Sequence, residues 1–434
     1  MIERYARKEA SGIFSLSSRY AYWQRIEAAC LEAMEELGVV PSGAASELRA
    51  VSIDVQEILE IEKERGHDVI AFIEYAAARM PTHGRFLHYG MTSSDVVDSA
   101  FACQLLDALD LVLSGATRAL DSLRRLALEH KDTVMVGRTH GIHAEPYSFG
   151  LKVLSWYKEL ERNIGRLEEA REQLAYGKIS GAVGTYAHLP PEVEARALKK
   201  VGLKPEPLST QVVPRDRHAH LFLQLALLAA GIERIMLEIR HLQRTEVLEL
   251  EEPFGRSQRG SSAMPHKKNP ILCENLCGLA RLMRSYVGPA LEDVALWHER
   301  DISHSSVERV IGEDALVLAD FMLHRLAFIL DGLIVHKGRM LHNLEALGGM
   351  VYSQRILLAL TERGMTRTKA YEAVQKAALD AFSEGGSFKE RISQDQNVRE
   401  VLSDKELEGL FSWGPYLRHV DTVYERCLGP SIQD

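Results

Sequence analysis

The sequence predicts an all-α protein with three helical domains. Three segments in the middle of the chain keep apolar or small residues at alternating spacings of four and three, over about thirty residues each. Helix breakers and capping residues divide the flanking regions into shorter helical patterns, and no segment alternates apolar and polar residues for long enough to indicate a sheet. We expect the domains at residues 1–92, 93–340 and 341–434.

The N-terminal domain, residues 1–92, begins with short helical patterns that end at glycines. One runs from Tyr20 to Leu37 and stops at Gly38, and a second runs from Asp54 to Arg65 and stops at Gly66. Glycine commonly ends a helix because it adopts left-handed backbone angles without steric cost. The next helix begins at His67.

The central domain is expected to hold a bundle of about five long helices. They span residues 101–126, 149–174, 221–242, 272–297 and 306–334. Helices of this length run about 45 Å, and their shared period predicts near-parallel packing. Pro289 should kink or interrupt the fourth helix, because proline lacks the N–H that continues the hydrogen-bond ladder.

The third bundle helix is apolar beyond the stripe that faces the bundle. Phe222, Leu223, Leu227 and Met236 lie outside that stripe. A helix that is apolar on more than one face is usually buried on more than one face. We therefore expect bundles from separate copies to pack together as a homo-oligomer.

The C-terminal domain, residues 341–434, returns to short helices. Thr366 is placed to cap a helix over Lys369 to Ala381, and Ser403 with Glu406 forms the pattern of a capping box.

Composition excludes several classes of protein. The formal net charge of -9 argues against a non-specific nucleic-acid binder. The longest apolar run, residues 221–232, is too short to span a bilayer, and residues 1–18 have no apolar core of a signal peptide, so we expect a cytoplasmic protein. The five cysteines are mostly dispersed, which favours reduced thiols over a zinc or redox site.

Four polar stretches punctuated by glycine or charged residues interrupt the helical patterns. They are Tyr89 to Asp95 preceded by His88, Gly137 to Pro146, Ser257 to Pro270 and His298 to Arg309. Long antiparallel helices bring their ends together, so stretches far apart in sequence can converge on one site.

The stretch from Ser257 to Pro270 has the composition of an anion site. Gly260 and Pro265 break any helix, and the segment offers serine hydroxyls, two lysines and an amide. A solvated basic surface loop has the same composition, and the segment alone leaves both interpretations open.

The other stretches have plainer alternatives as well. His140 and His143 with Glu145 could ligate a metal, but no third histidine or cysteine lies nearby, so we expect no metal. His67 and His88 could be ordinary histidines satisfied at helix ends. The residues from Thr92 to Asp95 are of the types that commonly cap the N-terminus of a helix, which alone would explain their presence.

Several motifs resemble one enzyme family. GSSAMPHKKNP at Gly260 to Pro270 resembles the signature loop of the fumarase/aspartase superfamily, and its His266 resembles adenylosuccinate lyases rather than fumarases or argininosuccinate lyases. The same branch is indicated by GRTHGIHAEP, HYGMTSSDVVD, STQVVPRDRH and WHERDISHSSVER. The likeness runs from ERY at Glu3 into the C-terminal domain and covers essentially the whole chain.

The resemblance implies a homotetramer in which four bundles form one helical core and each active site takes residues from three subunits. It implies no cofactor. The implied substrates are adenylosuccinate and its imidazole carboxamide ribotide analogue (SAICAR), cleaved to fumarate with AMP or AICAR. An argininosuccinate-cleaving relative and a catalytically silent helical scaffold are the alternatives.

The resemblance also assigns roles to residues of this chain. Ser261 is the general base, Lys267 stabilises the developing negative charge, His140 is the general acid, His67 is a second histidine that supports substrate or acid, and Glu274 orients His140. Because these roles need a dry site, the loop is expected to close over bound substrate.

Substrate binding is implied for two further groups of residues. Contacts to the nucleotide are implied for Arg4, Tyr5, Asp68, His88, Thr92, Ser93, Gln211, Arg300, Ser305 and Arg309. The succinyl group is expected near Thr139, Met264 and Asn269. Gly66 departs from the arginine that these lyases often carry before the His-Asp pair, which puts one phosphate contact in question.

Overall fold

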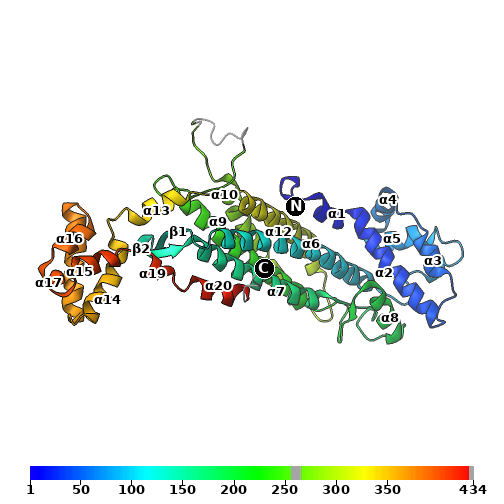
Figure 1. Ribbon diagram of the computed structural model, residues 1–434. Helices are drawn as coiled ribbons and strands as arrows, with labels where there is room; N and C mark the ends of the chain where they lie inside the picture. Colours follow the sequence, from blue (N-terminus) through cyan, green and yellow to red (C-terminus); the bar gives the residue numbers. More distant parts are fainter. Residues whose placement is uncertain (256–263, 265, 430–434) are drawn as a thin grey trace, which may run out of the picture. The chain divides into compact units, whose positions relative to one another are not determined.

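The computed structural model describes residues 1–255, 264 and 266–429 (Figure 1). The described chain is predominantly helical, which confirms the all-α prediction. It divides into two compact units. The first unit is Met1–Ala119, Leu160–Arg234 and Asn275–Ala327, and the second is Leu120–Glu159, Ile235–Glu274 and Phe328–Asp434. The division into three domains stays a prediction.

The first unit opens with short helices around a long one. Its N-terminal elements are η1 (Glu3–Tyr5), α1 (Lys8–Ile13), α2 (Leu16–Glu36), α3 (Ala44–Arg49), α4 (Val55–Arg65), α5 (Asp68–Ala77) and η2 (Gly84–Phe86). Helix α2 contacts both α3 and α8 (Pro191–Val201). The rings of Tyr20, Trp23 and Phe72 meet with centroids 5.4 to 6.1 Å apart and form an aromatic core there.

Gly66 has a structural role that explains its departure from the family pattern. It ends α4 with φ of 65°, in the left-handed region, and its N–H donates to the carbonyl of Glu62. An arginine at this backbone angle would be strained, so glycine suits this particular helix end.

The predicted long helices are all present. They are α6 (Ser93–Glu129), α7 (Phe149–Leu174), α9 (Asp216–Leu242), α10 (Ile271–Ser285), α11 (Val287–Glu292) and α12 (Ser303–Asp331). Every member of the predicted stripes on α7 and α9 is buried, as are those on α6 apart from Phe101. Helices α10 and α11 are separated at Tyr286, as Pro289 predicts, because that proline cannot donate to the carbonyl of Ser285.

Contacts within the first unit show how closely these helices pack. Phe101 of α6 stacks on His218 of α9 with ring centroids 5.7 Å apart. On α12, a Cβ at Gly312 would lie 2.6 Å from the Phe101 ring, so glycine is required for this approach.

The second unit contains a β-hairpin, and the expectation of no sheet was wrong at this point. Strands β1 (Val134–Thr139) and β2 (Ile142–Ser148) pair antiparallel through a two-residue turn at His140 and Gly141. Their φ values of 56° and 80° are both positive, as in a type I′ turn. A polar, glycine-containing sequence that we expected to be a simple interruption is therefore the tip of a hairpin.

Smaller strand pairs and short helices complete the two units. In the first unit, β3 (Tyr176–Gly177) pairs with β4 (Lys204–Pro205); in the second, β5 (Leu250–Glu251) pairs with β6 (Ile334–Val335). The second unit continues through α13 (Lys337–Glu345), η3 (Met350–Tyr352), α14 (Ser353–Glu362), α15 (Arg367–Glu384), α16 (Phe388–Gln394), α17 (Gln396–Val401), α18 (Asp404–Leu410), α19 (Gly414–Leu417) and α20 (Val420–Leu428).

The predicted caps of the C-terminal helices are found. Thr366 stands at the N-cap position of α15, although its side chain makes no capping hydrogen bond. Ser403 and Glu406 form the predicted capping box at the start of α18. Among the helices that the structure describes, none is long and apolar enough to cross a membrane.

Candidate active site

The candidate site residues fall into two groups, one in each unit. The first unit holds Arg4, Tyr5, His67, Asp68, His88, Thr92, Ser93, Gln211, Arg300, Ser305 and Arg309. The second holds Thr139, His140, Met264, Lys267, Asn269 and Glu274. Ser261, the expected general base, lies outside the described residues. We call these sets the nucleotide group and the catalytic group.

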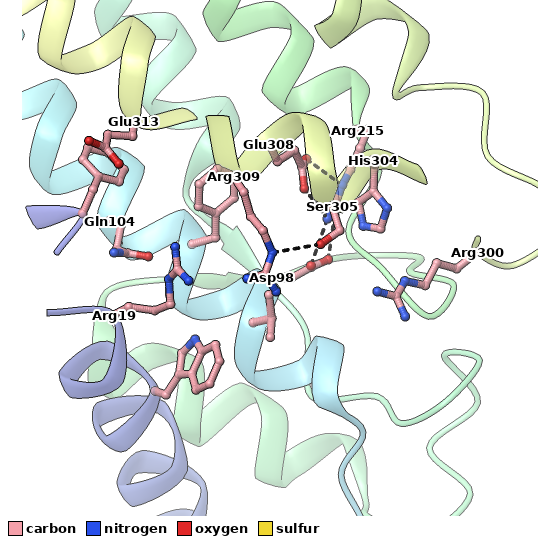
Figure 2. Close-up of a pocket in the computed structure, with 14 residues that line it drawn as sticks. Arg19, Asp98, Gln104, Arg215, Arg300, His304, Ser305, Glu308, Arg309 and Glu313 are labelled. Atoms are coloured by element: carbon pink, nitrogen blue, oxygen red, sulfur yellow. Dashed lines mark hydrogen bonds and ion pairs between the residues drawn. The ribbon is translucent and has the colours of Figure 1, made fainter. Parts of the chain in front are cut away.

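A pocket in the first unit contains part of the nucleotide group (Figure 2). It encloses about 720 Å³ of empty space, partly open to solvent, between α2, α6 and α12. Arg300, Ser305 and Arg309 line it, as predicted. The pocket also has lining residues that the sequence did not single out, namely Phe14, Arg19, Trp23, Val97, Asp98, Phe101, Gln104, Arg215, His304, Glu308 and Glu313.

Arg309 is held toward the pocket by two predicted partners. Its Nη2 donates to Oδ2 of Asp68 at 2.5 Å, and its Nε donates to the hydroxyl of Ser305 at 3.4 Å. Burial alone would raise the pKa of Asp68, but the hydrogen bond and charge of Arg309 outweigh burial and hold this pKa below its usual range. The ion pair joins α5 to α12, so residues far apart in sequence share one site.

Arg300 and Gln211 also meet. Nη1 of Arg300 donates to Oε1 of Gln211 at 3.1 Å, while Nε of Arg300 is buried without a hydrogen-bond partner among the described residues. The Gln211 amide is neutral. This hydrogen bond therefore does not neutralise the charge of Arg300.

The floor of the pocket is a buried ion network around Arg215. Its guanidinium donates to both oxygens of Asp98, at 2.6 and 3.0 Å, and to Oε2 of Glu308 at 3.0 Å. Burial raises the pKa of Glu308 to about 7 even though the charge of Arg215 acts in the opposite direction. This network connects α6 with α12 and fixes the turn of α12 that carries Ser305 and Arg309.

The N-terminal segment lies along the same helix. The ammonium group of Met1 contacts Glu313 at 3.2 Å, and the ring of Tyr5 packs edge-on against Phe321 with centroids 5.5 Å apart. Both partners belong to α12. Tyr5 thus packs on α12 beyond Arg309, and neither Arg4 nor Tyr5 lines the pocket, so their binding role stays a prediction.

The turn before α6 is rigidly held. The backbone N–H of Thr92 donates to Oδ2 of Asp95 at 2.8 Å, which is half of a capping box. Asp95 is itself buried in an ion pair with Lys178 and accepts the N–H of Ser180 at 3.2 Å. Thr92 and Ser93 therefore have fixed positions, and their N-cap role and a binding role are compatible.

Both histidines of the nucleotide group have structural partners. Nδ1 of His67 accepts the N–H of Ile70 at 3.5 Å and caps α5. The carboxylate of Glu27 contacts His88 twice. Its Oε2 accepts the backbone N–H of His88 at 3.2 Å, and its Oε1 lies 2.6 Å from Nδ1 of the His88 ring. Burial would lower the pKa of His88, but the charge and hydrogen bond of Glu27 outweigh burial and raise it.

In the second unit, His140 stands exposed at the hairpin tip with φ of 56°. A non-glycine residue in this region costs free energy and usually has a reason to be there. Hydrogen bonds to the buried Glu249 anchor the hairpin. Nη1 and Nη2 of Arg138 donate to its carboxylate at 2.9 and 2.7 Å, and the side-chain amide of Asn343 donates to it at 2.8 Å. A fixed hairpin thus presents Thr139 and His140 to solvent.

The remaining catalytic residues surround the start of α10. Buried Glu252 accepts the N–H groups of Leu272 and Cys273 at 3.1 and 2.9 Å, which satisfies the first turn of this helix. Glu274 is exposed and lies 3.9 Å from Arg240. No hydrogen bond joins Glu274 to His140 in the described part of the chain, so its role in orienting His140 stays a prediction.

The two lysines of the loop differ. Lys268 donates to Oε2 of Glu251 at 2.9 Å and so belongs to an ion pair. The side chain of Lys267 is exposed, as is that of Met264. Within the described residues, no three His, Cys, Asp or Glu side chains gather as metal ligands.

Comparisons with known proteins identify the family. A family model described as lyase matches residues 4–283, and one described as adenylosuccinate lyase C-terminus matches residues 349–427. The chain is 51% identical to adenylosuccinate lyase of Thermotoga maritima over 98% of this chain and 99% of that protein. It is 49% identical to adenylosuccinate lyase of Aquifex aeolicus over the full length of both. The chain belongs to the adenylosuccinate lyase family.

Two solved structures share the fold of this chain. A fumarate lyase from Mesorhizobium has a TM-score of 0.91 at 26% identity, and covers 99% of this chain and 100% of that one. A 3-carboxy-cis,cis-muconate lactonizing enzyme from Pseudomonas putida has a TM-score of 0.88 at 27% identity, over 98% of this chain and 97% of that one. The resemblance read from the loop motifs is confirmed.

Sequence reasoning about this adenylosuccinate lyase family member missed several residues around the site. Arg215 and Glu308 lie inside motifs that resemble the family, so a signal for them was available. Glu249 belongs to no motif that we used. Arg19 lies in an ordinary helical pattern, and only the fold brings it to the pocket.

Proposed function

We propose that the protein eliminates fumarate from adenylosuccinate to give AMP, and from SAICAR to give AICAR. The observation that carries the proposal is the pocket of the first unit, which Arg300, Ser305 and Arg309 line in a chain similar to adenylosuccinate lyases over its full length. Guanidinium groups and a hydroxyl are the donors that a nucleotide phosphate requires.

The first chemical step removes a proton from the succinyl carbon next to a carboxylate. The product of this step carries two negative charges on that carboxylate, so the step needs both a base and concentrated positive charge. Ser261 is the proposed base and accepts the proton. A serine hydroxyl is a poor base in water, and Lys267 with water excluded is proposed to favour its alkoxide.

The second step breaks the carbon–nitrogen bond. The electron pair of the carbanion forms the double bond of fumarate, and the bonding pair leaves with the nucleotide nitrogen, which takes a proton from His140. Imidazole can hold and release a proton near neutral pH. The exposed position of His140 on an anchored hairpin supports this role, because a proton donor must reach the leaving group without steric obstruction.

The active form is proposed to be a homotetramer with sites shared between three subunits. Leu223 and Leu227 of α9 are 41% and 45% exposed, although they lie on a helix of the central bundle. Exposed leucines on a bundle helix fit a surface that another copy covers. Light-scattering mass at micromolar protein tests this assembly, and a monomer with full activity would contradict it.

One assay tests the reaction. Fumarate release is followed with adenylosuccinate, SAICAR and argininosuccinate under identical conditions. The proposal expects turnover of the first two and none of the third. Turnover of argininosuccinate alone would indicate the other branch of the superfamily, and no turnover of any substrate would indicate a silent scaffold.

A further inference from the structure

Arg19 lines the pocket, and within the described residues no carboxylate hydrogen-bonds its guanidinium. It lies on α2 and is half-buried, and Figure 2 shows its guanidinium pointing toward the side of the pocket where Arg309 lies. Its guanidinium makes no hydrogen bond and no ion pair with the described residues, whereas its backbone N–H donates to the carbonyl of Ser15. Burial has the largest effect on the pKa of Arg19, followed by the charges of Arg309 and Asp68.

The other arginines of the pocket have clear partners. Arg215 is held by Asp98 and Glu308, Arg309 by Asp68, and Arg300 by the neutral Gln211. Asp68 therefore faces two guanidinium groups but bonds only one of them.

The charges of Asp68 and Glu313 both act on Arg19, but within the described residues neither carboxylate hydrogen-bonds its guanidinium. Burial and the charge of Arg309 both lower the pKa of Arg19, while the charges of Asp68 and Glu313 act in the opposite direction. A like-charged pair in a partly buried pocket is stabilised when a multiply charged anion enters.

We propose that Arg19 binds the phosphate of the nucleotide substrate together with Ser305 and Arg309. The proposal deepens the function proposed above and rests on it. Phosphate matches the site better than the succinyl carboxylates do, because it carries close to two charges and offers several acceptor oxygens to two guanidinium forks. The residues expected near the succinyl part, Thr139, Met264 and Asn269, belong to the second unit.

The test compares a substrate with and without its phosphate. Arg19→Met removes the guanidinium and keeps an unbranched side chain of similar reach. For Arg19→Met, we expect kcat/KM with adenylosuccinate to fall roughly 10- to 100-fold, mostly through KM, because one charge-assisted contact is lost. With the phosphate-free nucleoside analogue, succinyladenosine, kcat/KM should stay within about threefold of the wild type. Arg19→Lys should be intermediate, since a lysine keeps the charge but not the fork.

Arg25→Met is the matched control. Arg25 is on the same helix but outside this pocket, and its guanidinium bonds the carbonyl of Val201. Its loss should leave the preference for the phosphorylated substrate unchanged. A second measurement needs no turnover: AMP should raise the melting temperature of the wild type more than adenosine does, and Arg19→Met should reduce that difference.

The outcomes separate the two proposals. An equal loss with both substrates would show that Arg19 acts on the fold or on the shared part of the substrate, and would overturn the inference. An unchanged preference for the phosphorylated substrate would also overturn it. A wild type that cleaves neither substrate refutes the proposed function itself, and the AMP and adenosine melting curves then decide whether Arg19 still binds phosphate.

Discussion

The nucleotide group and the catalytic group differ in how completely one chain organises them. In the first, Arg309 is paired with Asp68, Arg300 with Gln211, and a buried network lies beneath them. In the second, His140 and Lys267 are exposed, and only the scaffold below them is fixed. Binding residues gain from being preorganised, and on the proposed mechanism the exposed residues of the catalytic group would be completed by substrate or by another copy.

The largest effect should come from removing a catalytic side chain. His140→Ala and Ser261→Ala are each expected to lower kcat by about 100- to 10,000-fold with little change in substrate binding, because proton transfer is lost while the nucleotide group is intact. Steady-state kinetics and equilibrium binding measure the two quantities separately. Near-normal turnover in either variant would remove that residue from the mechanism.

Mixing two inactive variants tests whether the nucleotide group and the catalytic group of one site come from different copies of the chain. If a site takes His67 from one copy and His140 from another, then His67→Ala and His140→Ala should regain activity when unfolded together and refolded as mixed oligomers. Each variant refolded alone is the control and should stay inactive. A mixture as inactive as its parts would mean that one chain supplies both residues.

A large loss of stability is expected when the hairpin loses its anchor. Glu249→Ala leaves Arg138 without its buried carboxylate, so the free energy of unfolding should fall by about 3–5 kcal/mol. Chemical denaturation measures this change. Glu60→Ala, which breaks an exposed pair with Lys63, is the control and should cost less than about 1 kcal/mol. Similar costs for both would show that the hairpin does not depend on Glu249.

The sequence predicted the parts of this molecule that follow from local periodicity. The stripes on α7 and α9, the end of α4 at Gly66 and the break at Pro289 are determined by residues close in the chain. The hairpin around His140 was not predicted, because its strands are short and its turn has a histidine where asparagine or aspartate is the usual signal.

The pairs within the site could not be predicted from the residues alone. Asp68 meets Arg309, and Glu27 meets His88, across long separations in the chain. Such contacts depend on how whole helices pack, which no local pattern encodes. The family resemblance supplied the candidate site residues but not the partners that they contact.

A smaller effect should distinguish Lys267 of the catalytic group from its neighbour Lys268. Lys267→Ala is expected to lower kcat/KM about 10- to 100-fold, since a charge near the developing carboxylate is lost. Lys268→Ala, its matched control, removes only the pair with Glu251 and should change kcat/KM less than about threefold. If the order were reversed, the ion pair of Lys268 rather than the exposed Lys267 would matter for the reaction.

The smallest effect concerns pH and the buried pair of the nucleotide group. Glu27 raises the pKa of His88 above its value in the unfolded chain, about 6.5, so the protonated form stabilises the folded state. This stabilisation is complete below the unfolded pKa and is lost as pH rises through the folded one. His88→Gln should therefore destabilise the protein more at pH about 6 than at pH about 9. Denaturation of both proteins across this range measures the difference. A constant difference would mean that the contact between Glu27 and His88 stabilises the fold without a change in protonation, and that the nucleotide group is preorganised by geometry alone.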